Sequence, residues 1–162
     1  ATYRGFQSVT LREDRISQED IRRNSRSSLR PPYCEYATHK ETEMLYANTA
    51  AGLVALLHLY FLVLEMFFWN KPLGRRVFGL TPEFAQASAA LAANQGLYNG
   101  FLAAGLLWGI GLGQAGYGIK LFFLGCVIVA GVFGALTASR KILWVQALPG
   151  AVALTLVLLF PA

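Results

Sequence analysis

From residue 44 to residue 162 the chain is almost continuously apolar, and polar residues interrupt it at few positions. Glu65 is the one charged residue between Met44 and Trp69, and the later stretches 84–119, 121–139 and 142–162 carry no charge. Each stretch is long enough to cross a hydrocarbon layer about 30 Å thick as a helix. The pattern predicts an all-α fold, a four-helix transmembrane bundle preceded by a disordered polar N-terminal tail.

Local signals set the bounds of the four predicted helices. The first ends in an aromatic cluster, Phe67 to Trp69, that suits a membrane interface. The second begins with Thr81 as N-cap, Pro82 at the first helical position and Glu83 at the positive end of the helix dipole. We therefore predict helices at about 47–69, 82–110, 120–138 and 143–160, within a transmembrane domain of residues 44–162.

The polar tail comprises residues 1–43, and we predict that it is disordered. It holds eight of the 14 Lys and Arg residues and seven of the nine Asp and Glu residues, without sustained apolar periodicity. Such a segment cannot bury enough apolar surface to offset the entropy lost on ordering. Because Met44 stands immediately before the first apolar helix, we expect it to be the natural start; a genuine tail is the alternative.

Composition excludes several functions. Charged residues make up 14% of the chain, against about a quarter in soluble domains. The Arg residues of the tail alternate with Glu and Asp, so no clustered basic face for nucleic acid is expected. Cys34 and Cys126 have no metal-ligand spacing, and no phosphate loop or catalytic motif of soluble enzymes is present. We predict no metal and no cofactor.

The loop charges predict an orientation. With four spans, the first and third loops lie on one side of the membrane, and the second loop offers only Lys120. Cytoplasmic loops carry an excess of Lys and Arg, so the side of the first and third loops is expected in the cytoplasm and both termini outside. The cationic residues of these two loops are Lys71, Arg75, Arg76, Arg140 and Lys141.

Two ionisable residues lie within the first predicted helix. His58 and Glu65 are seven residues apart, which places them on nearly the same face and about 10 Å apart along the axis. Ionisable groups inside a membrane are costly and often mark a site. They could border one polar cavity or serve as two stations of a proton path; alternatively, each bonds a neighbouring helix.

The second predicted helix carries a concentrated polar motif. The motif consists of four polar side chains that cover an arc of about 140° around the helix axis, namely Asn94, Gln95, Tyr98 and Asn99. Counted from the shared loop, Glu65 lies at a depth similar to Asn94 and Gln95, so a polar pocket between the first two helices is predicted. A hydrogen-bonded packing network is the alternative. The pocket candidates are His58, Glu65, Asn94, Gln95, Tyr98 and Asn99.

Small residues at every fourth position predict close helix packing. Ala92, Gly96, Gly100 and Ala104 form such a ridge on the second helix, and Gly134 belongs to a similar ridge on the third. Small side chains let helix backbones approach closely in a membrane. We therefore assign these positions to helix–helix contacts.

Three segments also carry a resemblance: HLYFLVLEMFFW (58–69), GRRVFGLTPEF (74–84) and LAANQGLYNGFLAAGLLWG (91–109). In their residues and in their order along the chain, they resemble the bacterial membrane family called domain of unknown function 1304, over essentially residues 44–162. The resemblance implies a small four-helix integral protein of the cell membrane, with members that begin near Met44. It implies no activity, substrate or catalytic residue.

Three functions stay open at this stage. The first is a small-molecule or proton-linked carrier component, in which Glu65 and His58 titrate and the Asn and Tyr side chains bind a polar group; it predicts a homo-oligomer in the lipid bilayer. The second is a membrane enzyme for a lipid-soluble substrate, with Glu65 or His58 as acid–base group. The third is a structural or assembly subunit whose polar residues specify helix pairing.

Overall fold

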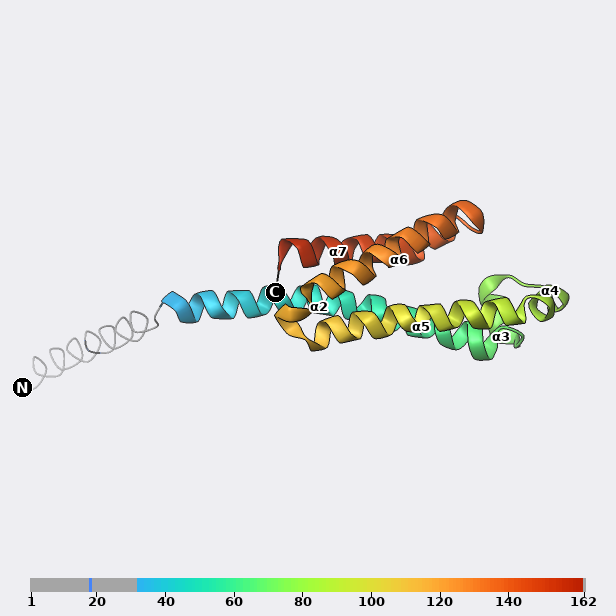
Figure 1. Ribbon diagram of the computed structural model, residues 1–162, viewed down its shortest axis with the longest axis horizontal. Helices are drawn as coiled ribbons and strands as arrows, with labels where there is room; N and C mark the ends of the chain where they lie inside the picture. Colours follow the sequence, from blue (N-terminus) through green and yellow to red (C-terminus); the bar gives the residue numbers. More distant parts are fainter. Residues whose placement is uncertain (1–17, 19–31, 162) are drawn as a thin grey trace, which may run out of the picture. The chain divides into compact units, whose positions relative to one another are not determined.

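The computed structural model describes residue 18 and residues 32–161, and every regular element within them is a helix (Figure 1). The all-α class is confirmed for these residues. The chain divides into two units, residues 1–41 and 42–162, and the packing described below is that of the second unit.

Four long helical segments and three short connecting helices make up the described chain. Two of the long segments contain a wider π-helical turn, η1 after α2 and η3 before α7. The long segments are α2 (Pro32–Val63) with η1 (Leu64–Phe68), α5 (Ala89–Gly111), α6 (Tyr117–Thr137), and η3 (Leu143–Ala147) with α7 (Leu148–Leu159). The short helices are α3 (Pro72–Phe78), α4 (Pro82–Ala87) and η2 (Gly113–Gly116).

The first helix begins earlier than the apolar pattern predicts. Residues 32–43, which we predicted as the end of a disordered tail, belong to α2 (Pro32–Val63). They continue as one helix into the apolar segment. Residues 1–17 and 19–31 of the predicted tail lie outside the described residues.

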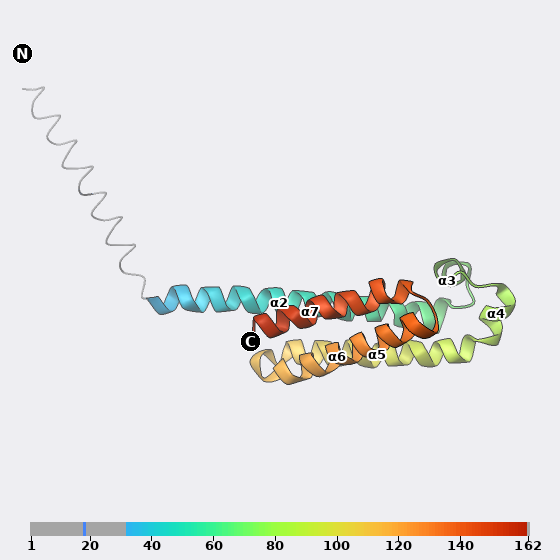
Figure 2. The same cartoon turned by 90° about the horizontal axis from the view of Figure 1, so that it is seen from above.

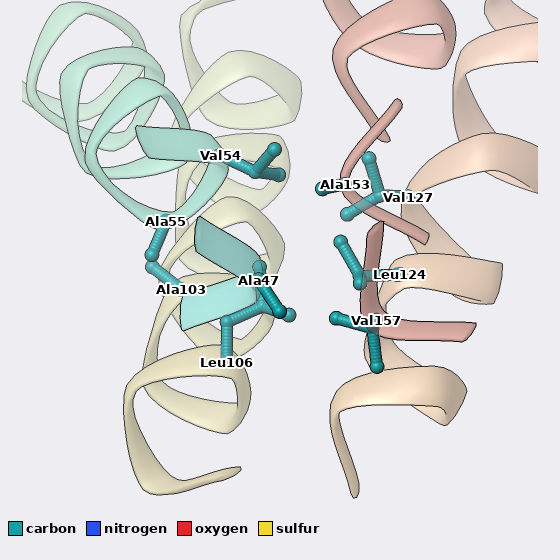
Figure 3. Packing of buried hydrophobic residues seen from close by; sticks show 9 residues of the cluster. All are labelled: Ala47, Val54, Ala55, Ala103, Leu106, Leu124, Val127, Ala153 and Val157. Atoms are coloured by element: carbon teal, nitrogen blue, oxygen red, sulfur yellow. The ribbon is translucent and has the colours of Figure 1, made fainter. Parts of the chain in front are cut away.

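One hydrophobic core joins the four long segments of residues 42–162. In Figure 3, Val54 of α2 points toward Val127 of α6 and Ala153 of α7, whereas Ala55 of α2 lies against Ala103 of α5. All of these side chains are buried, and most are small. The small side chains allow the helices to lie close to each other, as the Gly- and Ala-rich sequence indicates.

The long helices of this unit run back and forth between two ends. The turn between α6 and η3 lies toward the same end as α3 and α4, and the turn between α5 and α6 lies at the opposite end (Figures 1 and 2). α5 packs against α6 and η1, and α6 packs against η3 and α7. The first and third connections therefore share one end of the bundle.

The second predicted helix is divided by Ser88 into α4 and α5. Its start signals are confirmed: the Phe84 N–H donates to the Thr81 hydroxyl at 3.3 Å, with Pro82 and Glu83 in the first turn. The Ser88 hydroxyl donates to the Phe84 carbonyl at 2.6 Å and accepts from the Trp69 indole at 3.1 Å. The expectation of one continuous helix is wrong, because the Ser88 backbone (φ −100°, ψ 4°) lies outside the helical range and separates α4 from α5.

A wide turn follows from a proline in the last segment. Pro149 has no N–H, so the α-helical pattern is interrupted before it. In η3 the Leu148 N–H instead donates to the Leu143 carbonyl, five residues back. The Gln146 side chain of this turn donates to the Val127 carbonyl of α6 at 3.3 Å. The wider turn thus points a polar side chain at the neighbouring helix.

Glycines form the turn between α5 and α6. Gly113 has φ +57°, a conformation that L side chains rarely adopt. A Cβ on Gly116 would collide with the backbone carbonyl of Gly109, so α5 and η2 can cross this closely only because Gly116 lacks a side chain. This close crossing places the start of α6 directly beside the end of α5.

Two helical segments of the described chain are long and apolar enough to cross a membrane, namely His39–Phe68 and Gly113–Thr137. The segment Leu143–Leu159 is apolar but shorter. α5 has sufficient length, but Asn94, Gln95 and Asn99 lower its apolar character. Length and composition by themselves are weak evidence for a membrane, because a buried core helix has the same properties.

Candidate functional site

A hydrogen bond between two polar side chains joins the first and second long segments. The Asn99 amide Nδ2 donates to the Glu65 carboxyl Oε2 at 2.7 Å. Asn99 is 4% exposed on α5, and Glu65 is half-buried in the wide turn η1. The pair therefore lies where η1 packs on α5, one helical turn beyond the Asn94 and Gln95 level that sequence counting indicated.

The glycine at position 96 makes this approach of η1 to α5 possible. A Cβ on Gly96 would lie 2.7 Å from the Met66 Cγ and 3.1 Å from the Glu65 Cβ. Gly96 and Asn99 belong to the same buried face of α5, together with Ala92, Ala103 and Leu106. The small ridge and the polar site are thus parts of one contact surface.

His58 is separate from this pair and fully buried, with 0% exposure. Its Nδ1 lies 2.8 Å from the Val54 carbonyl on the same helix. Since a carbonyl can only accept, Nδ1 carries the hydrogen and Nε2 is left with a lone pair when the ring is neutral. Nε2 is buried and has no partner among the described residues, and Phe61 packs edge-on with ring centroids 6.2 Å apart.

Lys120 is a buried residue that the sequence analysis missed. We placed it at the start of the third helix and counted its charge with the second loop; it lies in the first turn of α6, but it is only 1% exposed. Its Nζ donates to the Asn48 Oδ1 of α2 at 2.9 Å. The available signal was its isolation, since Lys120 is the one charge between two long uncharged stretches, and Asn48 is a polar residue at the start of the first predicted helix.

The other three pocket candidates lie on the outside of α5. Asn94 and Gln95 are exposed, and Tyr98 is 53% exposed and contacts the Phe101 ring. The structure therefore brings Glu65 and Asn99 together and leaves Asn94, Gln95 and Tyr98 pointing away from them. The buried ridge passes through Gly96 and Asn99, so the remaining polar arc is turned outward.

Three of the predicted packing positions, Gly96, Gly100 and Gly134, contact a neighbouring segment, and Ala104 does not. Gly96 contacts η1, and a Cβ on Gly100 would lie 2.6 Å from the Leu62 Cδ1 of α2. Gly134 faces Ile142, whose Cγ2 would lie 3.1 Å from an added Cβ. Ala104 is exposed and does not belong to the buried face. The physical reason is that the buried face follows a three- and four-residue spacing, which diverges from a strict fourfold repeat by the third turn.

Three ionisable side chains at separate places in residues 42–162 have neutral hydrogen-bond partners. Glu65 bonds an amide, Lys120 bonds an amide, and His58 bonds a backbone carbonyl. An amide carries both donors and acceptors, so it can bond a carboxyl group in either protonation state. Within the described residues, no group of three His, Cys, Asp or Glu side chains is arranged to hold a metal ion. The chemistry that this arrangement offers is proton exchange.

Comparison with known proteins assigns the chain to a family of helical proteins. The chain belongs to the family described as protein of unknown function (DUF1304), which matches residues 52–158. It is 34% identical over 96 residues to the uncharacterized protein YpaA of Lactococcus lactis subsp. lactis (strain IL1403), covering 58% of this chain and 81% of that protein. No solved structure matches the chain. The matched range includes His58, Glu65, Asn99 and Lys120.

Proposed function

We propose that this chain is a multi-pass integral protein of the bacterial cytoplasmic membrane, with all four long segments in the bilayer. The supporting observation is the apolar outer surface of residues 42–162. On α6, Val129 is 70% exposed and Leu136 is 81% exposed, with Phe122 and Phe133 also outward. Soluble monomers rarely expose continuous apolar surface of this extent. Lipid tails would cover it.

The distribution of charge supports one orientation in that membrane. The first and third connections, which carry the five loop cations, lie at the same end of residues 42–162 (Figures 1 and 2). At the opposite end Lys120 is buried, so the turn between α5 and α6 presents no cation. We place the cationic end in the cytoplasm, because short cytoplasmic loops are enriched in Lys and Arg.

The function that this geometry supports best is that of a proton-linked carrier component for a small molecule. The observation that carries it is the bond between Glu65 and Asn99. A carboxyl group inside a membrane is costly, and this one has a neutral partner in place of a counter-charge. Because its partner is an amide and not a cation, Glu65 can gain or lose a proton without leaving a buried cation unpaired. His58, two helical turns away, adds a second group able to exchange protons.

Reconstitution of the full chain into liposomes that contain a trapped pH-sensitive dye tests this function. Small amines, amides and organic acids are added outside in turn. We expect one chemical class to drive proton movement, and Glu65→Gln to slow this movement at least about tenfold. The fold-change corresponds to about 1.4 kcal/mol. Glu83→Gln is the matched control, because Glu83 is an exposed carboxylate in α4.

The carrier function is contradicted if no compound moves protons, or if both variants behave like the wild type. The structure also favours a second candidate, a structural subunit, because the same polar residues join helices. Glu65 joins η1 to α5, and Lys120 joins α6 to α2. In that case Glu65→Gln lowers the unfolding temperature of the purified protein, and no compound gives a signal that depends on Glu65.

A further inference from the structure

The outward face of α5 has polar residues where a lipid-facing helix would have apolar ones. We propose that this face, formed by Leu91, Asn94, Gln95, Tyr98 and Phe101, binds a second copy of the chain in the same membrane orientation. This inference rests on the membrane location proposed above. It does not require that the protein is a carrier.

The polar groups of this face have no partner within the described part of the chain. Asn94, Gln95 and Tyr98 form no hydrogen bond there, and all three are exposed. In a bilayer the monomer would leave two amides and a phenol in or near the hydrocarbon. Each unsatisfied polar group in hydrocarbon costs several kcal/mol, so the face requires a protein neighbour.

The neighbour cannot use the small-residue ridges, because the monomer already occupies them. Gly96 and Gly100 contact Glu65, Met66 and Leu62 of the first long segment. Gly134 contacts Ile142 within the same chain. A homo-oligomer must therefore form elsewhere. The outward face of α5 gathers three exposed polar side chains within five residues of one helix.

In a second copy of the chain, the residues of this face lie at the same depth in the membrane as those of the first copy. Both copies insert with the cationic end on the same side, since the charge asymmetry acts on each of them. Their α5 helices then run parallel, and each residue meets the other copy at its own level. Leu91, Asn94, Tyr98 and Phe101 are separated by three, four and three residues, the spacing of a helix–helix seam.

A second copy also fits the face in chemistry. Each Asn or Gln amide has donors and an acceptor, so the amides of two identical faces can bond each other. Isologous contacts of this kind are the commonest form of homodimer. The aromatic contact between Tyr98 and Phe101, with centroids 6.2 Å apart, supplies apolar area beside the amides. No partner of different chemistry is needed to satisfy the face.

Disulfide cross-linking of the full chain in membranes tests the proposal. Cys34→Ser and Cys126→Ser remove the native thiols, and Tyr98→Cys places one thiol at the centre of the face. We expect oxidation to give a covalent dimer with Tyr98→Cys. Val129→Cys is the matched control, because Val129 is exposed on α6 at a comparable distance from the cationic end of its helix. It is expected to give no dimer.

A second pair of substitutions, Asn94→Leu with Gln95→Leu, separates an interface from a lipid-facing surface. At an interface the apolar change lowers the dimer fraction about tenfold, measured as Förster transfer between labelled chains in liposomes. The proposal is overturned if this change leaves the dimer fraction unaltered, if Tyr98→Cys gives no dimer, or if Val129→Cys dimerises equally. Alkaline carbonate extraction distinguishes the cause: a chain released from membranes contradicts the membrane location itself, whereas a retained monomer contradicts only the interface.

Discussion

At the residue scale, Lys120 and Asn48 show how an apolar bundle holds one buried charge. The ammonium group is buried with an amide oxygen as its bonded partner at 2.9 Å. Removing the hydrogen-bond partner of a buried charge lowers stability more than removing the charged group does. The remaining charge has then lost its contact with water and has no partner in the protein to compensate for it. The two residues should therefore respond unequally to substitution.

We expect Asn48→Ala to lower the free energy of unfolding by about 2–3 kcal/mol, since it leaves the Lys120 ammonium without its partner. Lys120→Met keeps the length of the side chain and removes the charge, and is expected to change stability by less than about 1 kcal/mol. Denaturant unfolding in mixed micelles, followed by tryptophan fluorescence, measures both. In a Lys120→Met background, Asn48→Ala should become nearly neutral. A larger loss for Lys120→Met than for Asn48→Ala would contradict this account.

At the element scale, α6 has one side that touches a neighbouring helix and another that is open. Gly131 faces the backbone of Ala147, where an added Cβ would lie 2.7 Å from the nitrogen. At Gly125, on the same helix, a Cβ would meet nothing within 4 Å. The two glycines are thus a matched pair that separates close packing from helix propensity.

We expect Gly125→Ala to raise the free energy of unfolding by about 0.5–1 kcal/mol, because alanine is the better helix former. Gly131→Ala should lower it by about 1–3 kcal/mol, because a backbone atom cannot move aside as a flexible side chain can. Thermal unfolding of the two variants in the same detergent compares them. Equal shifts of the two unfolding temperatures would show that η3 does not pack on α6 as closely as described.

At the scale of the whole molecule, one end of residues 42–162 is cationic and the other is not. Burial of Lys120 sharpens this asymmetry, because it removes the one cation that the sequence placed at the second loop. The orientation that we propose in the membrane rests on this asymmetry.

Thiol labelling on intact cells tests the orientation. In a background of Cys34→Ser and Cys126→Ser, Gln114→Cys places a thiol in the turn between α5 and α6, and Ser139→Cys places one in the turn before η3. Both positions are exposed. We expect an impermeant maleimide to label Gln114→Cys directly and Ser139→Cys only after the cells are permeabilised. The reverse pattern would place the cationic end outside.

The local pattern of the sequence determined the helical class and most helix ends. Apolar runs of 20 or so residues, the Thr81–Pro82–Glu83 start and the glycine-rich turn each act through neighbouring residues, so they can be recognised without a fold. The division at Ser88 was not recognised; there the Ser88 hydroxyl accepts from the indole of Trp69, 19 residues away in sequence, and the local pattern does not reveal such a contact. The helical residues 32–43 of α2 were missed, since a polar segment can continue a helix without apolar periodicity.

The candidate site was determined in part by sequence and in part by packing. Sequence identified the polar residues and the glycines, because such residues are rare or regularly spaced in an apolar chain. It could not say which of Asn94, Gln95, Tyr98 and Asn99 faces Glu65, since an arc of about 140° exceeds what one neighbouring helix can cover. The tertiary structure decided for Asn99, which shares a face with Gly96, where the closest approach of η1 is possible. Tertiary packing likewise made Lys120 a buried residue, because burial depends on which helices surround a side chain and not on its neighbours in sequence.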